Sequence, residues 1–179
     1  MLILITVWVA SSFDYFLINF QLKYIEGNIF RNTAASGLSE LPAVILGGFL
    51  YYKVGIKITL VGSFTVAIIG GVLLIIFSDR PDLIQYFIFL AKCGVSSTFN
   101  IAYLANAQIF PAIFAGTAFG ICNLGAKIAT ILAPLIAEVS PPAPMIIFVC
   151  LASIALVLSF LIRKDPTTTA TSAPTKALK

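Results

Sequence analysis

The stretch that decides the fold runs from Leu90 to Pro134 and reads LAKCGVSSTFNIAYLANAQIFPAIFAGTAFGICNLGAKIATILAP. It consists of two long apolar segments joined at 108–111, and each segment contains one lysine, Lys92 or Lys127. A lysine inside an apolar membrane helix is costly unless it is paired or lines a water-filled cavity. Two such lysines, each beside small and amide side chains, predict a pathway for a polar solute rather than a plain membrane anchor.

The composition of the whole chain is that of a membrane protein. Of its 179 residues, 60% are hydrophobic and 10% are charged, and the mean hydropathy is +1.05. Soluble domains carry about 25% charged residues. The net charge of +4 comes from basic residues at the ends of apolar runs, without the aromatic-interleaved patches that bind nucleic acid. We therefore expect a lipid bilayer, and no nucleic acid, as the partner.

The residue types on which most enzymes rely are missing. Histidine, the commonest general base and metal ligand, is absent from the sequence. The three cysteines, at 93, 122 and 150, fall inside apolar runs at spacings that suit neither a zinc site nor a disulfide framework. We therefore expect no metal, no cofactor and no enzymatic activity.

Six apolar runs are long enough to cross a bilayer as helices, which takes about twenty residues. The runs are approximately 2–21, 34–52, 58–77, 83–106, 113–137 and 145–162. Prolines, glycines and charged residues separate them, as turns between membrane helices require. The sequence therefore predicts an all-α membrane protein in which residues 1–162 form a bundle of six transmembrane helices.

Basic residues are distributed unequally between the two sides that these six spans create. The side that holds the joint at 53–57, the corner at 108–111 and the end of the chain carries most of the lysines and arginines outside the spans. Because short basic loops stay inside, we expect both termini in the cytoplasm. Residues 163–179 are rich in threonine and alanine, and we expect a disordered cytoplasmic tail. The plasma membrane is the expected location, and an organelle membrane is the alternative.

The two lysines stand on polar stripes at helical spacing. The stripes are Lys92, Ser96, Asn100 and Tyr103 in the fourth span, and Gly116, Gly120, Asn123, Lys127, Thr130 and Pro134 in the fifth. Residues three or four apart share one face of an α-helix. We expect these faces to meet another helix or an aqueous cavity, because polar groups facing lipid stay unsatisfied. For the glycine pair in the fifth span, close helix packing is the simplest interpretation.

Several separated motifs resemble those of one transporter family. A glycine-asparagine pair at 27–28, after Glu26, is followed by a glutamate-leucine-proline triplet at 40–42, and then by the stretches 99–111 and 120–134. They are similar to the seventh-to-eighth helix signature, the end of the tenth helix and the eleventh helix of the organic cation and organic anion transporter group. This group belongs to the major facilitator superfamily.

The resemblance covers residues 8–162 and implies the C-terminal six-helix half of the facilitator fold. Members of this family move small organic ions by alternating access, with the substrate between two six-helix halves. The partners it implies are a small organic ion and the missing N-terminal half or another membrane subunit.

The chain departs from the family pattern at the cytoplasmic gate. At four positions where the family has charged residues, this chain has uncharged ones: Tyr52, Ile56, Gln108 and Ala115. In the family these charges form a latch between helices. The resemblance leaves Lys53, Gly55 and Lys57 as the expected remnant of the gate, so gating is either relaxed or rebuilt with other contacts.

The resemblance also implies roles for residues inside the spans. Lys127 occupies the position of the eleventh helix where anion-transporting members have a basic residue, and an ammonium group there is a natural counter-charge for a carboxylate or sulfate. We therefore expect an organic anion rather than a cation. The remainder of the expected site is Asn123 and Asn100 as a hydrogen-bonding wall and Tyr15 and Phe16 as an aromatic wall.

The charges inside the spans have a structural interpretation as well. Two lysines and two carboxylates sum to zero, and buried charges are usually paired. Asp14, Glu40 and Lys92 are therefore expected to form a buried charge network, and Lys127 joins it in the structural alternative. For Asp14, a second interpretation is a carboxylate that carries a proton during transport.

Two functions are consistent with half of a facilitator fold. The chain is either half or a fragment of an organic-ion carrier, or a non-transporting half-transporter that serves as a structural subunit of a larger membrane complex. The polar stripes favour the carrier, and the lost latch charges favour the structural subunit.

Overall fold

The computed structural model describes residues 2–25, 27–109 and 112–162. Within these ranges the regular elements are all α-helices, and six of them are long and apolar enough to cross a membrane, which confirms the predicted fold class. Met1, Glu26, the corner at 110–111 and the predicted tail at 163–179 lie outside the described residues.

The helices follow the predicted spans closely, except that the second helix begins at Ile29, five residues before its predicted start. In chain order they are α1 (Leu2–Gln21), α2 (Ile29–Val54), α3 (Ile56–Ile76), α4 (Pro81–Ile109), α5 (Ala112–Thr130), α6 (Ala133–Ala137) and α7 (Ala143–Leu161). The second helix begins before the predicted residue 34 because Asn28 caps it. The Asn28 side chain accepts hydrogen bonds from the backbone N–H groups of Phe30 (2.9 Å) and Arg31 (3.4 Å).

The joint between the second and third helices falls within the predicted range 53–57 and consists of Gly55 alone. The φ of this residue is +83°, a conformation that favours glycine. Its backbone N–H donates to the carbonyl of Tyr51, and its own carbonyl accepts a hydrogen bond of 2.8 Å from the hydroxyl of Thr59. A single glycine thus ends one helix and begins the next.

The fifth predicted span is one membrane crossing made of two helices, α5 and α6. The break falls at Ile131 and Leu132. Pro134 explains it, since proline has no N–H to donate to the carbonyl of Thr130 one turn earlier. The sequence pattern predicts one continuous helix for this run, and the break corrects that prediction.

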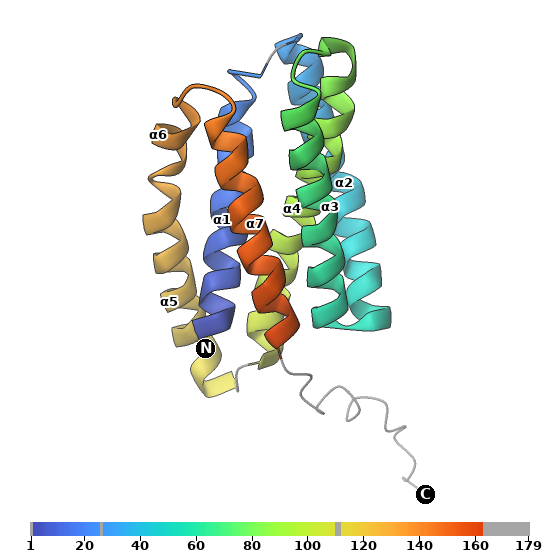
Figure 1. Ribbon diagram of the computed structural model, residues 1–179. Helices are drawn as coiled ribbons and strands as arrows, with labels where there is room; N and C mark the ends of the chain where they lie inside the picture. The colour runs from blue at the N-terminus through green and yellow to red at the C-terminus, as the bar shows by residue number, and fades with distance from the viewer. Residues whose placement is uncertain (1, 26, 110–111, 163–179) are drawn as a thin grey trace, which may run out of the picture.

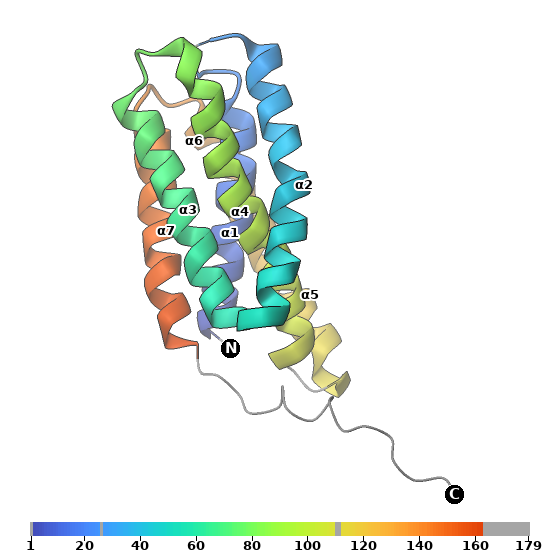
Figure 2. The same cartoon turned by 90° about the vertical axis from the view of Figure 1, so that its right-hand side faces the viewer.

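The centre of the bundle is formed by α1 and α4 (Figure 1). The first packs against α4, α5, α6 and α7, and the second packs against α1, α2 and α3. In the apolar parts of α1 and α4, 56% of residues are buried, against 22% in α2 and 17% in α5 with α6. Figure 2 shows α2 on one side of this central pair and α3 with α7 on the other. Much of α2 and α5 is therefore left for lipid or for a partner.

Both ends of the described chain lie at one end of the bundle. Figure 1 shows the start of α1 and the end of α7 beside the α2–α3 joint and the end of α4. This arrangement agrees with an even number of crossings. The side of the membrane on which this end lies stays a prediction.

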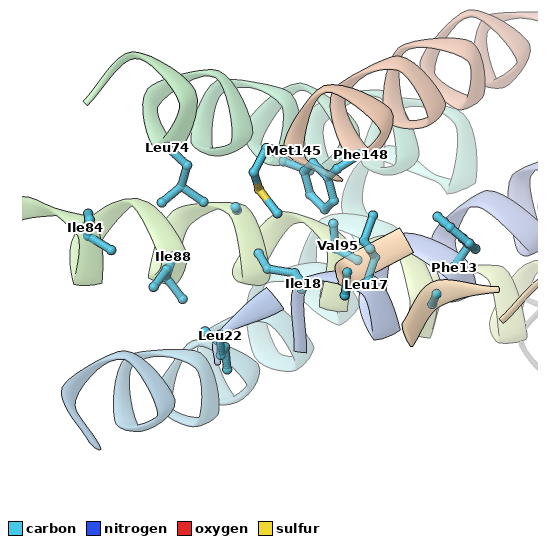
Figure 3. Packing of buried hydrophobic residues seen from close by; sticks show 14 residues of the cluster. Phe13, Leu17, Ile18, Leu22, Leu74, Ile84, Ile88, Val95, Met145 and Phe148 are labelled. Atoms are coloured by element: carbon cyan, nitrogen blue, oxygen red, sulfur yellow. The ribbon is translucent and has the colours of Figure 1, made fainter. Parts of the chain in front are cut away.

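The largest hydrophobic cluster joins five helices around α1 (Figure 3). Its fully buried side chains include Leu17 and Ile18 of α1, Ile88 of α4 and Phe148 of α7. Small residues of α6, Ala133 and Ala137, complete the cluster against α1. This packing holds the two parts of the broken fifth span against the centre of the bundle.

The third and fourth helices approach each other so closely that their backbones touch. A Cβ atom added at Gly94 of α4 would overlap the backbone of Ala67 in α3, and one added at Gly70 would overlap the backbone of Ala91. The absence of side chains at both glycines is therefore a condition of this helix crossing.

Close packing is not a general property of the glycines. A Cβ atom at Gly62 of α3 would meet nothing within 4 Å, and the same holds for Gly116 and Gly120 of α5. Within this chain the prediction of close packing is wrong for Gly116 and Gly120, because they lie on a surface that no neighbouring helix covers.

We expect Gly94→Ala to lower the free energy of unfolding by about 1–3 kcal/mol, because the added methyl group pushes α3 away from α4. Gly62→Ala is the matched control. It is expected to leave stability unchanged or to raise it by up to about 1 kcal/mol, because alanine favours the helix and the space is open. Thermal unfolding in detergent measures both, and equal responses of the two variants would contradict the backbone contact.

Candidate functional site

The best-defined polar cluster is built around Lys92 of α4. Its side chain is fully buried, and its Nζ donates a hydrogen bond of 2.7 Å to Oδ1 of Asn19. The same Nζ lies 3.5 Å from Oε1 of Glu40 and 3.4 Å from the centre of the Tyr15 ring, within cation–π range. Two other helices, α1 and α2, thus compensate the buried charge.

Glu40 of α2 is held from both α1 and α4. Tyr15 Oη donates a hydrogen bond of 2.7 Å to the same carboxylate oxygen that faces Lys92. The Glu40 side chain is 44% exposed, so it lies at the edge of the cluster rather than in its centre. The structure therefore brings Glu40 and Lys92 of the predicted network together and adds Asn19 and Tyr15 to them.

Asp14, the third member of the predicted network, lies apart from it. Its side chain has no exposed surface, and neither carboxylate oxygen has a hydrogen-bond partner in the described part of the chain. No ion pair links it to a lysine there, so the predicted pairing is wrong. Consecutive helical residues point about 100° apart, and Asp14 shares the face of Val7 and Ile18, which belong to the hydrophobic core.

Aromatic rings of α1, α4 and α5 form a continuous row. Tyr15 stacks on Phe99 with ring centres 5.1 Å apart and an angle of 17° between the rings. Phe99 meets Tyr103 at 5.0 Å, and Tyr103 meets Trp8 at 4.6 Å. Phe119 of α5 extends the row, 5.4 Å from Trp8 and 5.6 Å from Tyr103. Offset and edge-to-face pairs of this kind make a well-ordered wall.

Lys127 of α5 is exposed, and its Nζ lies 5.1 Å from the centre of the Phe16 ring. It forms no ion pair among the described residues, so the structural alternative of a pair with Asp14 or Glu40 is wrong. Phe16 meets the Tyr15 ring edge-on at 5.4 Å. The two lysines of the apolar spans therefore flank one aromatic pair, each beside one ring.

The two asparagines of the predicted wall, Asn100 and Asn123, differ in how many of their hydrogen-bonding groups are free to contact a solute. Asn100 is exposed, and its Nδ2 donates a hydrogen bond of 2.7 Å to the carbonyl of Ser96 in its own helix. Asn123 is half-buried and makes no hydrogen bond to another described residue. Asn100 therefore offers a carboxamide oxygen, and Asn123 offers a whole carboxamide group, to a solute.

Three residues of the cluster, Asn19, Phe99 and Phe119, are not among the site residues that the sequence predicts. Asn19 stands four residues after Tyr15 and therefore on the same face of α1, a spacing that could have identified it. The two phenylalanines carry no comparable signal, because an aromatic residue in a membrane helix packs equally well against lipid or another helix.

The gate residues Lys53, Gly55 and Lys57 lie together where α2 meets α3. The Lys53 ammonium group is 4.8 Å from the centre of the Phe49 ring. Neither lysine forms an ion pair within the described ranges. This half alone therefore does not rebuild a charged latch.

Clusters that suit a metal ion are absent from the described residues, in which no three or more Cys, Asp or Glu side chains come together. Cys93, Cys122 and Cys150 are separate free thiols. The groups that this site offers are ammonium, carboxylate, amide and aromatic groups.

Breaking the pair between Glu40 and Lys92 is expected to destabilise the bundle. Glu40→Ala should lower the free energy of unfolding by about 1–3 kcal/mol, less than for a fully buried pair because Glu40 is partly exposed. In the double variant Glu40→Ala with Lys92→Met, at least half of this loss should return, since no buried charge is left unpaired. Thermal unfolding measures both variants, and simple addition of two losses would contradict the coupling.

Replacing Asp14 by an apolar residue of similar size is expected to stabilise the protein. Asp14→Val should raise the free energy of unfolding by about 1–3 kcal/mol, because it removes a buried carboxyl group without partners. The control Asp79→Val changes an exposed carboxylate and should stay within about 0.5 kcal/mol. A lower unfolding temperature for Asp14→Val would show that the carboxyl group makes a favourable contact.

Six membrane-length helices are consistent with one six-helix half of the facilitator fold. Lys127, Asn100 and Glu40, with the Tyr15 and Phe16 rings, form a partly exposed face of this bundle, called the open face below. No family model matches the chain. Individual relatives do match, and all of those compared below are solute transporters by name.

The chain is 31% identical to solute carrier family 22 member 15 of Xenopus tropicalis over 146 residues, which are 75% of this chain and 27% of the relative. It is 26% identical to human solute carrier family 22 member 13 over 168 residues, 90% of this chain and 30% of the relative. It is 24% identical to human organic cation/carnitine transporter 2 over 134 residues, which are 73% of this chain and 24% of the relative.

The chain belongs to the organic cation and organic anion transporter family, solute carrier family 22, within the major facilitator superfamily. This confirms the resemblance that the motifs predicted. The chain spans less than a third of the length of the relatives to which it is compared.

Proposed function

We propose that the chain is half of a carrier that moves small organic ions, organic anions in preference to cations, across a membrane by alternating access. The observation that carries this proposal is the position of Lys127, an ammonium group beside Phe16 that forms no ion pair among the described residues. The family relationship supports transport in general.

The charges on the open face favour an anion. Lys92 and Glu40 compensate each other, and Asp14 is buried on another face of α1. Lys127 is therefore left with a positive charge that a carboxylate or sulfate can balance. The ring of Phe16 and the row that begins at Tyr15 offer apolar surface for the body of such a solute.

The exposed polar groups support a functional unit larger than this chain. Lys127 and Asn100 are exposed and Glu40 is partly exposed, within helices of membrane length. Charged and polar groups at this depth normally face protein or a water-filled cavity rather than lipid. We propose that a second six-helix half, either the missing N-terminal half or another membrane subunit, covers this face.

The proposed orientation puts the α2–α3 joint in the cytoplasm. Lys53 and Lys57 lie at this end of the bundle, as do the start of α1 and the end of α7. Short loops with excess lysine and arginine are retained inside. The proposed location is the plasma membrane, with both termini in the cytoplasm.

A second candidate function is a structural subunit that no longer transports. The observation in its favour is the gate, where Lys53 lies beside Phe49 and no ion pair forms among the described residues. Transport of an organic ion by the complete assembly separates the two functions. An assembly that reaches the membrane and moves no organic ion would support the structural subunit.

We expect Lys127→Ala to reduce uptake of aromatic carboxylates and sulfates at least about tenfold, a loss of about 1.4 kcal/mol of binding. Lys127→Asp should do the same and should increase uptake of aromatic ammonium ions, because it inverts the charge. The measurement is uptake of radiolabelled solutes into cells that express the chain together with its other half.

Two variants control this measurement. Lys127→Arg keeps the charge and should retain most of the anion uptake. Lys23→Ala removes an exposed lysine outside the helices and should change neither activity. Anion uptake by Lys127→Ala equal to that of the original chain would refute the counter-charge role.

A further inference from the structure

A cavity of about 320 Å³ lies at the end of the bundle opposite the α2–α3 joint. Its walls come from the end of α1, the end of α3, the start of α4 and the segment that leads into α7. Neither α2 nor α5, which contribute Glu40 and Lys127 to the open face, lines it. The cavity is therefore separate from the proposed transport site.

The inner wall of the cavity is apolar and well ordered. Leu74, Ile84 and Met145 line it and also belong to the largest core cluster, with exposed fractions of 5%, 1% and 6%. Figure 3 shows that Leu74 and Met145 point toward the helix that carries Ile84. This wall suits a hydrocarbon group, and it is pre-formed because the same side chains hold four helices together.

The polar groups of the wall include an unsatisfied amide. Gln21 lines the cavity with 2% of its surface exposed, and its Oε1 has no hydrogen-bond partner among the described residues. A buried carboxamide oxygen without a partner costs free energy, and such groups normally bind water or a ligand. The unsatisfied oxygen indicates that a donor group belongs beside the cavity wall.

The charge of the lining is negative. Asp79 is the one charged residue among the described residues that line the cavity. Tyr24 contributes an aromatic ring to the lining, and the Nζ of its neighbour Lys23 lies 5.2 Å from the centre of this ring, so the ring is in cation–π range of an ammonium group. A carboxylate, an aromatic face and an amide oxygen around an apolar wall are the groups that recognise an organic ammonium ion.

We propose that this cavity binds a small organic ammonium ion, with Asp79 as its counter-charge and Leu74, Ile84 and Met145 around its hydrocarbon part. Gln21 accepts a hydrogen bond from the ligand, directly or through a water molecule. The cavity volume is at the lower end of the range for small-molecule sites, about 300–1,000 Å³. The site is opposite in charge preference to the Lys127 face and lies on other elements.

The experiment measures binding of benzylammonium chloride, whose N–H groups can donate to Gln21, to the complete carrier that contains this chain, purified in a detergent without an ammonium group. Calorimetry should show binding, and the unfolding temperature should rise with probe concentration because the ligand stabilises the folded state. Sodium chloride at equal concentration controls for ionic strength, and sodium benzenesulfonate tests the charge preference of the site.

Asp79→Asn should weaken binding of the ammonium probe at least about tenfold, equivalent to about 1.4 kcal/mol. Asp82→Asn is the matched control: it removes a carboxylate three residues further on, which does not line the cavity, and should not change the affinity. Both residues are exposed, so neither variant should prevent folding. Gln21→Leu should weaken binding as well. Equal affinities of Asp79→Asn and the original chain would overturn the proposal.

A third variant keeps this proposal distinct from the transport function. Lys127→Ala should bind the ammonium probe unchanged, whatever it does to anion uptake. Loss of probe binding in Lys127→Ala would place the probe at the transport face and would overturn the cavity site.

An ethanolamine lipid headgroup offers the same chemistry as a free organic ammonium ion, because both carry a positive charge and N–H donors. The two sources are separated by repeating the titration in phosphatidylglycerol nanodiscs with and without phosphatidylethanolamine. Weaker probe binding in the presence of phosphatidylethanolamine identifies the headgroup as an occupant, and equal affinities identify a free cation. Either result, with the loss in Asp79→Asn, supports the ammonium site, whereas no probe binding in any medium overturns it.

Discussion

The buried ammonium group of Lys92 is the constraint on which the arrangement of the central helices depends. A charge without exposed surface inside an apolar bundle needs compensation, and here it comes from Glu40 of α2 and from Asn19 and Tyr15 of α1. Rotation or sliding of α4 against either neighbour would remove a partner. The same contacts fix Tyr15 and Glu40 at the edge of the open face, so the structural pair also shapes the candidate binding site.

The charge of Lys92 is compensated within the chain, by Glu40 and Asn19. The proposed role as counter-charge for a solute therefore falls to the other lysine of the spans, Lys127. Lys127 forms no ion pair in the described residues and lies beside Phe16 at an open face. The cavity at the opposite end carries the reverse charge, with Asp79 in its wall and no basic lining residue among those described. The central helix α1 contributes to both places. The two proposed sites are therefore opposite in charge preference, and their separation rests on which helices line each.

Local features of the fold were predictable where the signal lies in neighbouring residues. The six crossings follow from runs of apolar residues, and the amide of Asn28 and the ring of Pro134 explain the two boundaries that differed. The glycines show where local reasoning ends. Gly70 and Gly62 lie in the same helix and look alike in sequence, but only Gly70 touches a neighbouring backbone, because contact depends on which face another helix covers.

The sequence by itself determined the membrane class, the number of crossings, the family motifs and the face on which each polar side chain stands. These properties depend on residue type and on spacing along one helix. Only the tertiary structure decided the partners: Lys92 with Glu40, Lys127 beside Phe16, and Asp14 without an ion pair to any described residue. Spacing along one helix cannot supply them, because the rotation and height of one helix against another follow from packing over the whole bundle.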